Sequence, residues 1–200
     1  MPPRAAPARD KLLDAALGTI RAQGYAGTSV DDLCRAAGVT KGAFFHHFPS
    51  KEALAVEAAA RFGAMADALF AEAPFRAAPD PLDRLLGYVA FRRDIIAGEF
   101  ADFTCLVGTM VQESYFTSPA IRAACEAAIF GHAATLEPDI AAAMAERAMP
   151  GDPASLARHI QAVIQGAFIL AKASRSAAVA RESLDHLHRY LELLFKGDRT

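Results

Sequence analysis

Two lysines and two histidines stand close together between residues 39 and 54, in the segment Val-Thr-Lys-Gly-Ala-Phe-Phe-His-His-Phe-Pro-Ser-Lys-Glu-Ala-Leu. Lys41 and Lys51 can donate hydrogen bonds to phosphate oxygens, and Lys41 can also donate to guanine acceptors in a major groove. His46 and His47 would lie about 100° apart around a helix, so they cannot readily bind one metal ion. The segment therefore favours contact with phosphates and base edges over metal chemistry.

A short helix must position these side chains. Thr40 offers an N-cap for a helix from Lys41 to about His47, and Pro49 cannot continue that helix. A helix of this length buries too little surface to be explained as core alone. Ser50 offers the next N-cap, which predicts a long fourth helix from residue 51 to about residue 71.

Two further helices are predicted ahead of this segment. Apolar residues recur at helical spacing over residues 10–23, and Gly24 ends that helix. Thr28 or Ser29 can cap a brief second helix over about residues 30–37. A helix, a short turn with glycine and a second short helix form the helix-turn-helix pattern, whose second helix can enter a major groove.

The remainder of the chain predicts a helical bundle. Alanine, the best helix former, is abundant, and no segment has a convincing strand pattern. Helices separated by proline and glycine are expected over about residues 81–97, 102–115, 119–147, 154–174 and 179–195. The predicted fold class is all-α, with an N-terminal three-helix helix-turn-helix head joined to a larger C-terminal helical bundle.

Composition excludes several classes of protein. With 53% hydrophobic and 22% charged residues, the chain of 200 residues can bury a packed core. Its three cysteines, without a C-x-x-C pair, indicate neither a disulfide framework nor a zinc cluster and fit a reducing, cytoplasmic location. No apolar run reaches the roughly 20 residues that span a bilayer, and the N-terminus lacks the apolar core of a signal peptide, so no membrane partner is expected.

Charge and motifs narrow the function further. The first 53 residues hold seven lysines and arginines and five acidic residues, whereas the whole chain has a net charge of -2. A mildly basic head is compatible with nucleic acid, although the asymmetry is small. No glycine-rich phosphate loop, G-x-S-x-G or H-E-x-x-H motif is present. We therefore expect no enzyme activity, no catalytic residues, no cofactor and no metal.

One stretch closely resembles a known family. Residues 24–54, Gly-Tyr-Ala-Gly-Thr-Ser-Val-Asp-Asp-Leu-Cys-Arg-Ala-Ala-Gly-Val-Thr-Lys-Gly-Ala-Phe-Phe-His-His-Phe-Pro-Ser-Lys-Glu-Ala-Leu, resemble the DNA-binding head of the tetracycline-repressor (TetR) family. The resemblance implies a homodimer that binds double-stranded operator DNA and is released by a small-molecule effector. It divides the chain into a disordered arm (1–8), a DNA-binding head (9–53) and a ligand-binding and dimerisation domain (54–200).

The resemblance also assigns roles within the head. The positions that match DNA contacts are Thr28, Ser29, Thr40, Lys41, Gly42, Ala43, Phe45, His46, His47 and Lys51. The positions that match phosphate contacts are Thr28, Ser29, Ala43, His47 and Lys51. The positions that match groove contacts are Lys41, Gly42, Phe45 and His46, while Phe44 and Phe48 match buried positions. Family members usually have tyrosine where Phe45 stands, so Phe45 cannot make the usual hydroxyl contact to phosphate but can touch a thymine methyl group.

A ligand pocket is expected along the apolar segment 103–110. The predicted pocket residues are Met65, Leu69, Phe103, Cys105, Leu106, Met110 and Phe168. Bulky apolar groups beside small ones and a thiol suit a ligand cavity, although ordinary core is the competing interpretation of each residue. Cys105 has an alternative role as a thiol that senses electrophiles, but buried free cysteines are usually inert.

The last two helices carry apolar stripes that suit a dimer interface of four helices. The predicted interface residues are Ile160, Ile164, Phe168, Leu187, Leu191 and Leu194. Core within one chain is the competing interpretation. A palindromic operator requires two heads spaced roughly 34 Å or a multiple apart, which favours the interface.

These observations predict a transcriptional repressor that a small, largely apolar ligand releases from a palindromic operator. The alternative is an all-α ligand-binding or interaction protein that no longer reads DNA. This alternative is supported by the missing hydroxyl at Phe45 and by the acidic pair Asp31 and Asp32, which would repel DNA phosphates. We interpret the acidic pair instead as capping residues of the second helix.

Overall fold

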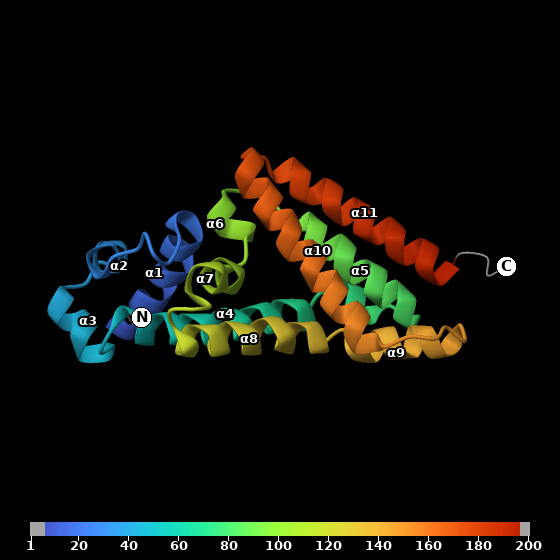
Figure 1. Ribbon diagram of the computed structural model, residues 1–200, viewed down its shortest axis with the longest axis horizontal. Coiled ribbons are helices and arrows are strands. Elements are labelled where there is room, and N and C mark those ends of the chain that lie inside the picture. Colours follow the sequence, from blue (N-terminus) through green and yellow to red (C-terminus); the bar gives the residue numbers. More distant parts are fainter. Residues whose placement is uncertain (1–6, 197–200) are drawn as a thin grey trace, which may run out of the picture. The chain divides into compact units, whose positions relative to one another are not determined.

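The computed structural model describes residues 7–196, and helices without any strand make up the regular structure of these residues (Figure 1). The chain forms two compact units. The head unit comprises the chain up to Met65 together with Thr104–Ala128, and the bundle unit comprises Ala66–Phe103 and the chain from Ile129 onward. The all-α prediction is confirmed. The head unit also includes Thr104–Ala128, a segment that lies outside the predicted head of residues 9–53.

The head unit begins with the three helices that the sequence predicts. They are α1 (Ala8–Gln23), α2 (Val30–Ala37) and α3 (Lys41–His47). Gly24 ends α1, and Gly38 ends α2 in the left-handed region with φ 64°. The predicted arm, residues 1–8, falls mostly outside the described residues, and Ala8 already belongs to α1.

Three more helices contribute to the head unit. The first part of α4 (Lys51–Ala71), all of α7 (Leu106–Ser114) and the first part of α8 (Pro119–Ala134) belong to it. Apolar residues of these and the preceding helices are fully buried, among them Leu12, Ile20, Leu33, Phe44, Phe48, Leu54 and Met110. This core fixes how α3 is presented.

The bundle unit holds the remaining helices. In order they are the end of α4, the 3-10 turn η1 (Pro74–Ala77), α5 (Pro81–Asp94), α6 (Phe100–Phe103), the end of α8, α9 (Glu137–Glu146), α10 (Pro153–Ser174) and α11 (Ala177–Lys196). Helix α11 packs against both α10 and α5, and α9 packs against α5 and α10 (Figure 1).

Two predicted helices are each divided in the structure. The expected helix over 102–115 is interrupted after Phe103, and the side chain of Cys105 accepts a hydrogen bond from the Gly108 N–H at 3.3 Å to start α7. The expected helix over 119–147 ends at Ala134, and Pro138 lies in the first turn of α9. Proline is well tolerated there because first-turn amides lack a helical partner.

Candidate functional site

Helix α3 presents one face to solvent and buries the other. Phe44 and Phe48 are fully buried, with ring centroids 6.0 Å apart, which confirms their predicted burial. Lys41, Gly42 and His46 are exposed, and the Phe45 ring is 51% exposed. The predicted groove-facing residues therefore share an accessible surface, while two aromatic rings hold the helix in place.

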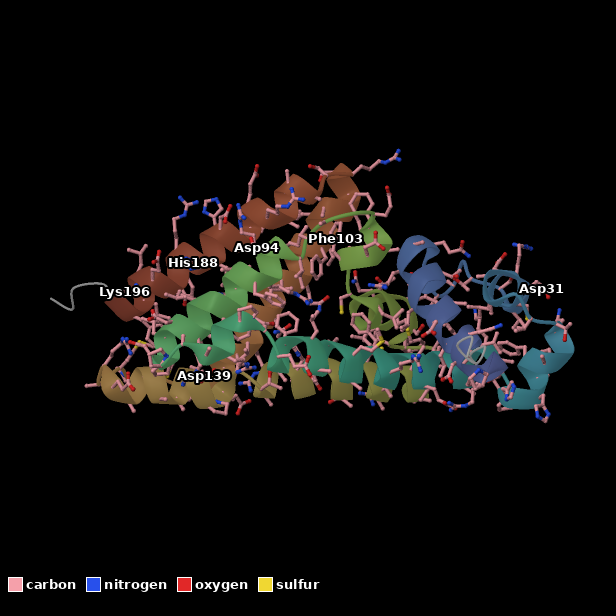
Figure 2. The ribbon with its side chains drawn as sticks, turned by 180° about the vertical axis from the view of Figure 1, so that it is seen from behind. Asp31, Asp94, Phe103, Asp139, His188 and Lys196 are labelled. Atoms are coloured by element: carbon pink, nitrogen blue, oxygen red, sulfur yellow. The ribbon has the colours of Figure 1, made fainter. Side chains whose placement is uncertain are left out.

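Lys41 is paired with an acidic residue of the neighbouring helix. Its Nζ lies 3.0 Å from Oδ1 of Asp31, which is in the first turn of α2 (Figure 2). Both side chains are more than half exposed. An exposed pair of this kind contributes about 0–1 kcal/mol, so a phosphate or a base edge can replace Asp31 as the partner of Lys41.

Gly42 has no steric role in the fold. A Cβ atom built at this position would have Thr40 Oγ1, at 3.8 Å, as its nearest neighbour. Glycine inside a helix costs roughly 1 kcal/mol relative to alanine. Gly42 therefore weakens α3 without a packing reason inside the protein. Its small size leaves space for a molecule that binds to α3 from outside.

The hydroxyl groups at the two helix starts act within the fold. Thr28, 1% exposed, donates to the Gly24 carbonyl oxygen at 2.6 Å. Ser29 Oγ accepts from the Asp32 N–H at 3.1 Å, and the Ser29 N–H donates to the Asp32 carboxylate at 3.0 Å, forming a capping box. Thr40 accepts from the Ala43 N–H at 3.2 Å. The predicted phosphate contacts of Thr28 and Ser29 therefore compete with bonds that start α2.

The capping box changes the acidity of Asp32. Hydrogen bonds from the Ser29 hydroxyl and backbone N–H, followed by one from Arg35, lower the pKa of the Asp32 carboxyl to about 2. The carboxylate is thus ionised at neutral pH at the positive end of α2. This agrees with the capping role expected for Asp32.

Lys51 also has an internal role that the sequence did not predict. Its Nζ donates to the carbonyl oxygens of Tyr25 and Thr28 at 2.9 and 2.8 Å and lies 4.2 Å from the centre of the Tyr25 ring. Burial lowers the pKa of Lys51. An ammonium group has three donors, and two of those of Lys51 hold the turn before α2.

Glu113 of α7 holds the same turn and was missed by sequence reasoning. Its carboxylate accepts from the Ala26 N–H at 2.7 Å, and its charge favours the protonated form of Lys51. No motif marks this glutamate, because its partner is 87 residues away in the chain. Lys51 and Glu113 together fix the turn that sets the start of α2.

The two histidines of α3 lie side by side with ring centroids 4.9 Å apart. His46 is exposed and His47 is half-buried. Within residues 7–196, no three His, Cys, Asp or Glu side chains gather as a metal site would require.

The structure divides the predicted pocket residues between the two units. Phe103 of α6 (Figure 2) and Phe168 of α10 meet in the bundle unit, with ring centroids 6.1 Å apart. Met65 and Leu69 of α4 are about half exposed. The remaining predicted residues are buried in the head unit, namely Cys105, Leu106 and Met110.

The three cysteines of the chain all lie in the head unit. All three cysteines are free and buried. Burial, followed by the proximity of Cys105, raises the pKa of Cys125 to about 12. A thiol this weakly acidic is a poor nucleophile at neutral pH, so Cys125 does not suit electrophile sensing. The sensing role of Cys105 stays a prediction.

A chain of polar side chains crosses the bundle unit. The Tyr88 hydroxyl lies 3.1 Å from His132 Nε2 and accepts from Gln161 at 2.8 Å, while His132 Nδ1 lies 3.0 Å from the Asp67 carboxylate. Burial, opposed by Asp67, lowers the pKa of His132, so the ring is neutral at pH 7. Its proton is then on Nδ1 facing Asp67, and Nε2 accepts from Tyr88.

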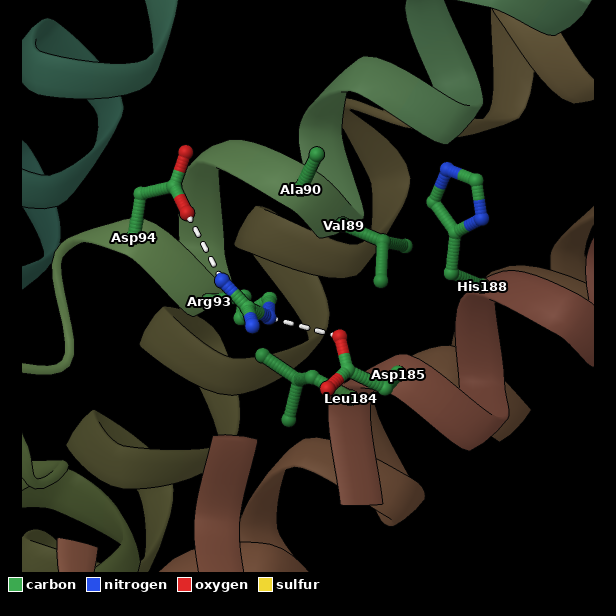
Figure 3. A pocket seen from close by; sticks show the side chains of 7 residues that line it. All are labelled: Val89, Ala90, Arg93, Asp94, Leu184, Asp185 and His188. Atoms are coloured by element: carbon green, nitrogen blue, oxygen red, sulfur yellow. Dashed lines mark hydrogen bonds and ion pairs between the residues drawn. The ribbon is translucent and has the colours of Figure 1, made fainter. Parts of the chain in front are cut away.

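One pocket of about 230 Å³ lies between α5 and α11 (Figure 3). Its lining residues are Val89, Ala90, Arg93, Asp94, Leu184, Asp185 and His188. None of the predicted pocket residues lines it. Arg93 in its wall already pairs with Asp185 at 2.6 Å and with Asp94 at 3.3 Å.

Five of the six predicted dimer residues are buried within their own chain, which argues against an interface role for these five. Ile160, Ile164 and Leu191 are fully buried, Phe168 and Leu187 are nearly so, and Leu194 is half-buried. A side chain that its own chain covers has no surface left for a partner. The exposed apolar residues of α10 and α11 are instead Ile169, Leu170, Tyr190 and Leu193.

Family comparisons cover both parts of the chain. Residues 12–58 match the family described as bacterial regulatory proteins of the tetR family. Residues 81–186 match the C-terminal domain of LmrA/YxaF-like transcriptional regulators, which is more than half of the chain. Within the described residues, no helix is long and apolar enough to cross a membrane.

Individual relatives agree with this assignment. The transcriptional regulator LmrA of Bacillus subtilis is 30% identical over 128 residues, covering 60% of this chain and 64% of its own. The transcriptional repressor DhaR of a Mycobacterium species is 29% identical over 116 residues, covering 58% and 57%. The chain thus matches less than two thirds of the length of these relatives. The crystal structure of reduced Escherichia coli NemR is similar, with a TM-score of 0.77, 26% identity and coverage of 90% of this chain and 94% of that chain.

Proposed function

Because the chain belongs to the TetR family of bacterial transcriptional regulators, we propose that it is a homodimeric repressor released from a palindromic operator by a small effector. The single observation that carries this proposal is the division of α3 into an exposed face and a face anchored by Phe44 and Phe48. The name of the relative DhaR as a repressor favours repression over activation. Such a regulator acts in the cytoplasm, where it meets the DNA.

The proposed DNA contacts differ in kind. Lys41, Gly42, Phe45 and His46 form the exposed face of α3 and would meet the bases. Ala43, His47 and the third donor of Lys51 would lie against phosphates. Thr28, Ser29 and Thr40 would act mainly by holding the helix starts, where backbone N–H groups can bind phosphate.

A fluorescence anisotropy titration with DNA from beside the protein's own gene tests the proposal. We expect binding that weakens steeply with salt, because lysine–phosphate contacts release counterions. Lys41→Ala and His46→Ala should each weaken specific binding by roughly tenfold or more while the melting temperature stays unchanged. Absent binding at low salt would instead favour a ligand-binding protein without DNA readout.

We propose that the second copy binds at the exposed face of α10 and α11. Ile169 and Leu170 of α10, with Tyr190 and Leu193 of α11, leave apolar surface on these packed helices. The His159 and Tyr190 rings, 5.5 Å apart, continue that surface across the pair. Exposed apolar residues gathered on one helix pair are characteristic of a protein interface.

We propose that the effector binds in the bundle unit near Phe103 and Phe168. These two predicted pocket residues meet there, and the polar chain from Gln161 to Asp67 crosses the same unit. Aromatic rings with a few polar groups are the usual lining of a small-molecule site. Release of DNA on addition of a ligand that also raises the melting temperature would support an effector role.

A further inference from the structure

Arg92 of α5 carries a positive charge without a counter-charge. Its guanidinium carbon lies 5.2 Å from the centre of the Phe70 ring and 5.3 Å from the centre of the Phe168 ring. Its Nε is buried and has no hydrogen-bond partner, while its terminal nitrogens are not fully buried. Within residues 7–196, Arg92 forms no ion pair. Two aromatic rings thus flank a charged group that pairs with no acidic side chain of the described residues.

The neighbouring polar groups do not serve as partners for Arg92. His132 uses both ring nitrogens, one toward Tyr88 and one toward Asp67. The charge of Arg92 itself contributes to the lowered pKa of His132, so the two groups are close enough to repel when His132 is protonated. The Asp67 carboxylate is bound to His132, and it forms no ion pair with Arg92.

Other arginines of the chain show how unusual this environment is. Arg61 also has a buried Nε without a partner, but its terminal nitrogens pair with Asp10 and Asp14 at 3.2 and 2.8 Å. Arg93 in the α5–α11 pocket is paired with Asp94 and Asp185. An arginine cannot lose its charge in a protein, so partial burial of its guanidinium without an anion costs free energy. Cation–π contacts offset only part of that cost.

We propose that Arg92 binds the carboxylate of a small organic acid. The proposal rests on the effector role given above and names the chemical class of the effector. A guanidinium presents paired donors that match the two oxygens of a carboxylate. The Phe70 and Phe168 rings on either side of Arg92 hold its guanidinium in place. Such a ligand supplies the missing negative charge.

Matched ligand pairs test this proposal on the full chain without DNA. The probes are hexanoate, benzoate, phenylacetate and 3-phenylpropionate, each measured by calorimetry beside its primary amide. At least one carboxylate should bind and exceed its amide by roughly tenfold or more, as expected for a charge-assisted hydrogen-bonded pair. The proposal is overturned when no carboxylate binds more tightly than its amide.

Variants at Arg92 provide a second test of the proposal. Arg92→Met keeps a long apolar side chain and should lose at least about tenfold in carboxylate affinity, whereas Arg92→Lys should keep part of it. Arg92→Gln serves as a second uncharged variant if methionine prevents folding. The melting temperature of Arg92→Met without ligand should equal or exceed that of the native protein, because an unpaired charge is removed. Equal carboxylate affinities in native and uncharged proteins would overturn the assignment.

A surface arginine supplies the matched control. Arg122→Met removes an exposed arginine that pairs with Glu126 one turn away, and carboxylate binding should stay unchanged. DNA release is measured separately. Arg92-dependent carboxylate binding by a protein that shows no DNA binding would refute the repressor role and leave the Arg92 assignment intact.

Discussion

The Lys51 ammonium donates to the Thr28 carbonyl oxygen across 2.8 Å, so the first residue of α4 holds the chain just ahead of α2. The same ammonium binds the Tyr25 carbonyl, and Glu113 of α7 binds the Ala26 N–H. Residues from two distant segments, α4 and α7, therefore fix one turn. The orientation of α2, and with it the Asp31 partner of Lys41, depends on this turn.

Lys51→Met should destabilise the protein by about 1–3 kcal/mol, because two carbonyl oxygens lose a charged donor. Chemical denaturation monitored by circular dichroism measures the change. Lys11→Met is the matched control, since Lys11 is exposed on α1 and its loss should alter stability by less than about 0.5 kcal/mol. Equal stability of the two variants would contradict the structural role of Lys51.

Sequence patterns predicted the head more fully than the sites. Caps and glycines define α1 to α3, because these signals are local to each helix end. The internal roles of Lys51 and Thr28 were not predicted, since both depend on partners brought together by folding. Arg92 carries no local signal at all, because its significance lies in the absence of an ion pair within the described residues.

The stripes of α10 and α11 show a second limit of sequence reasoning. Helical periodicity identifies an apolar face but cannot tell whether the same chain or a second copy covers it. Ile160 and Leu191 are covered by their own chain. Tyr190 and Leu193, which are not among the predicted interface residues, are exposed. Packing geometry alone decides between these outcomes.

Gly42→Ala should stabilise the protein by about 0.5–1 kcal/mol and weaken operator binding. No protein atom lies within 3.8 Å of the added methyl group, and alanine favours the helix. The methyl group would meet the DNA instead. Gly18→Ala on α1 is the control, since a Cβ there also meets no neighbour within 4 Å. Gly18→Ala should raise stability similarly without changing DNA affinity in anisotropy titrations. If both variants lose the same affinity for DNA, the DNA does not approach Gly42 closely.

Asp32→Asn should destabilise the protein near pH 6 and have progressively less effect as the pH falls toward 2. The folded-state pKa of about 2 lies below the ordinary value of 3.8, so the ionised form stabilises the fold. That stabilisation is present above the unfolded-state pKa and is lost as the pH falls through the folded-state pKa. Thermal melts of native and variant proteins across this range measure it. Ser29→Ala should reproduce the trend, and a difference independent of pH would contradict it.

Leu193→Arg should convert the dimer to monomers, because a charge replaces an apolar side chain that is 73% exposed on the proposed α10–α11 interface. Burying an unpaired charge at such a contact is costly, so a loss of at least about tenfold in dimer affinity is expected. Sedimentation velocity over a range of concentrations measures the association. Phe116→Arg is the matched control, since Phe116 is 85% exposed but lies outside α10 and α11. A monomeric Phe116→Arg protein beside a dimeric Leu193→Arg protein would move the interface away from α10 and α11.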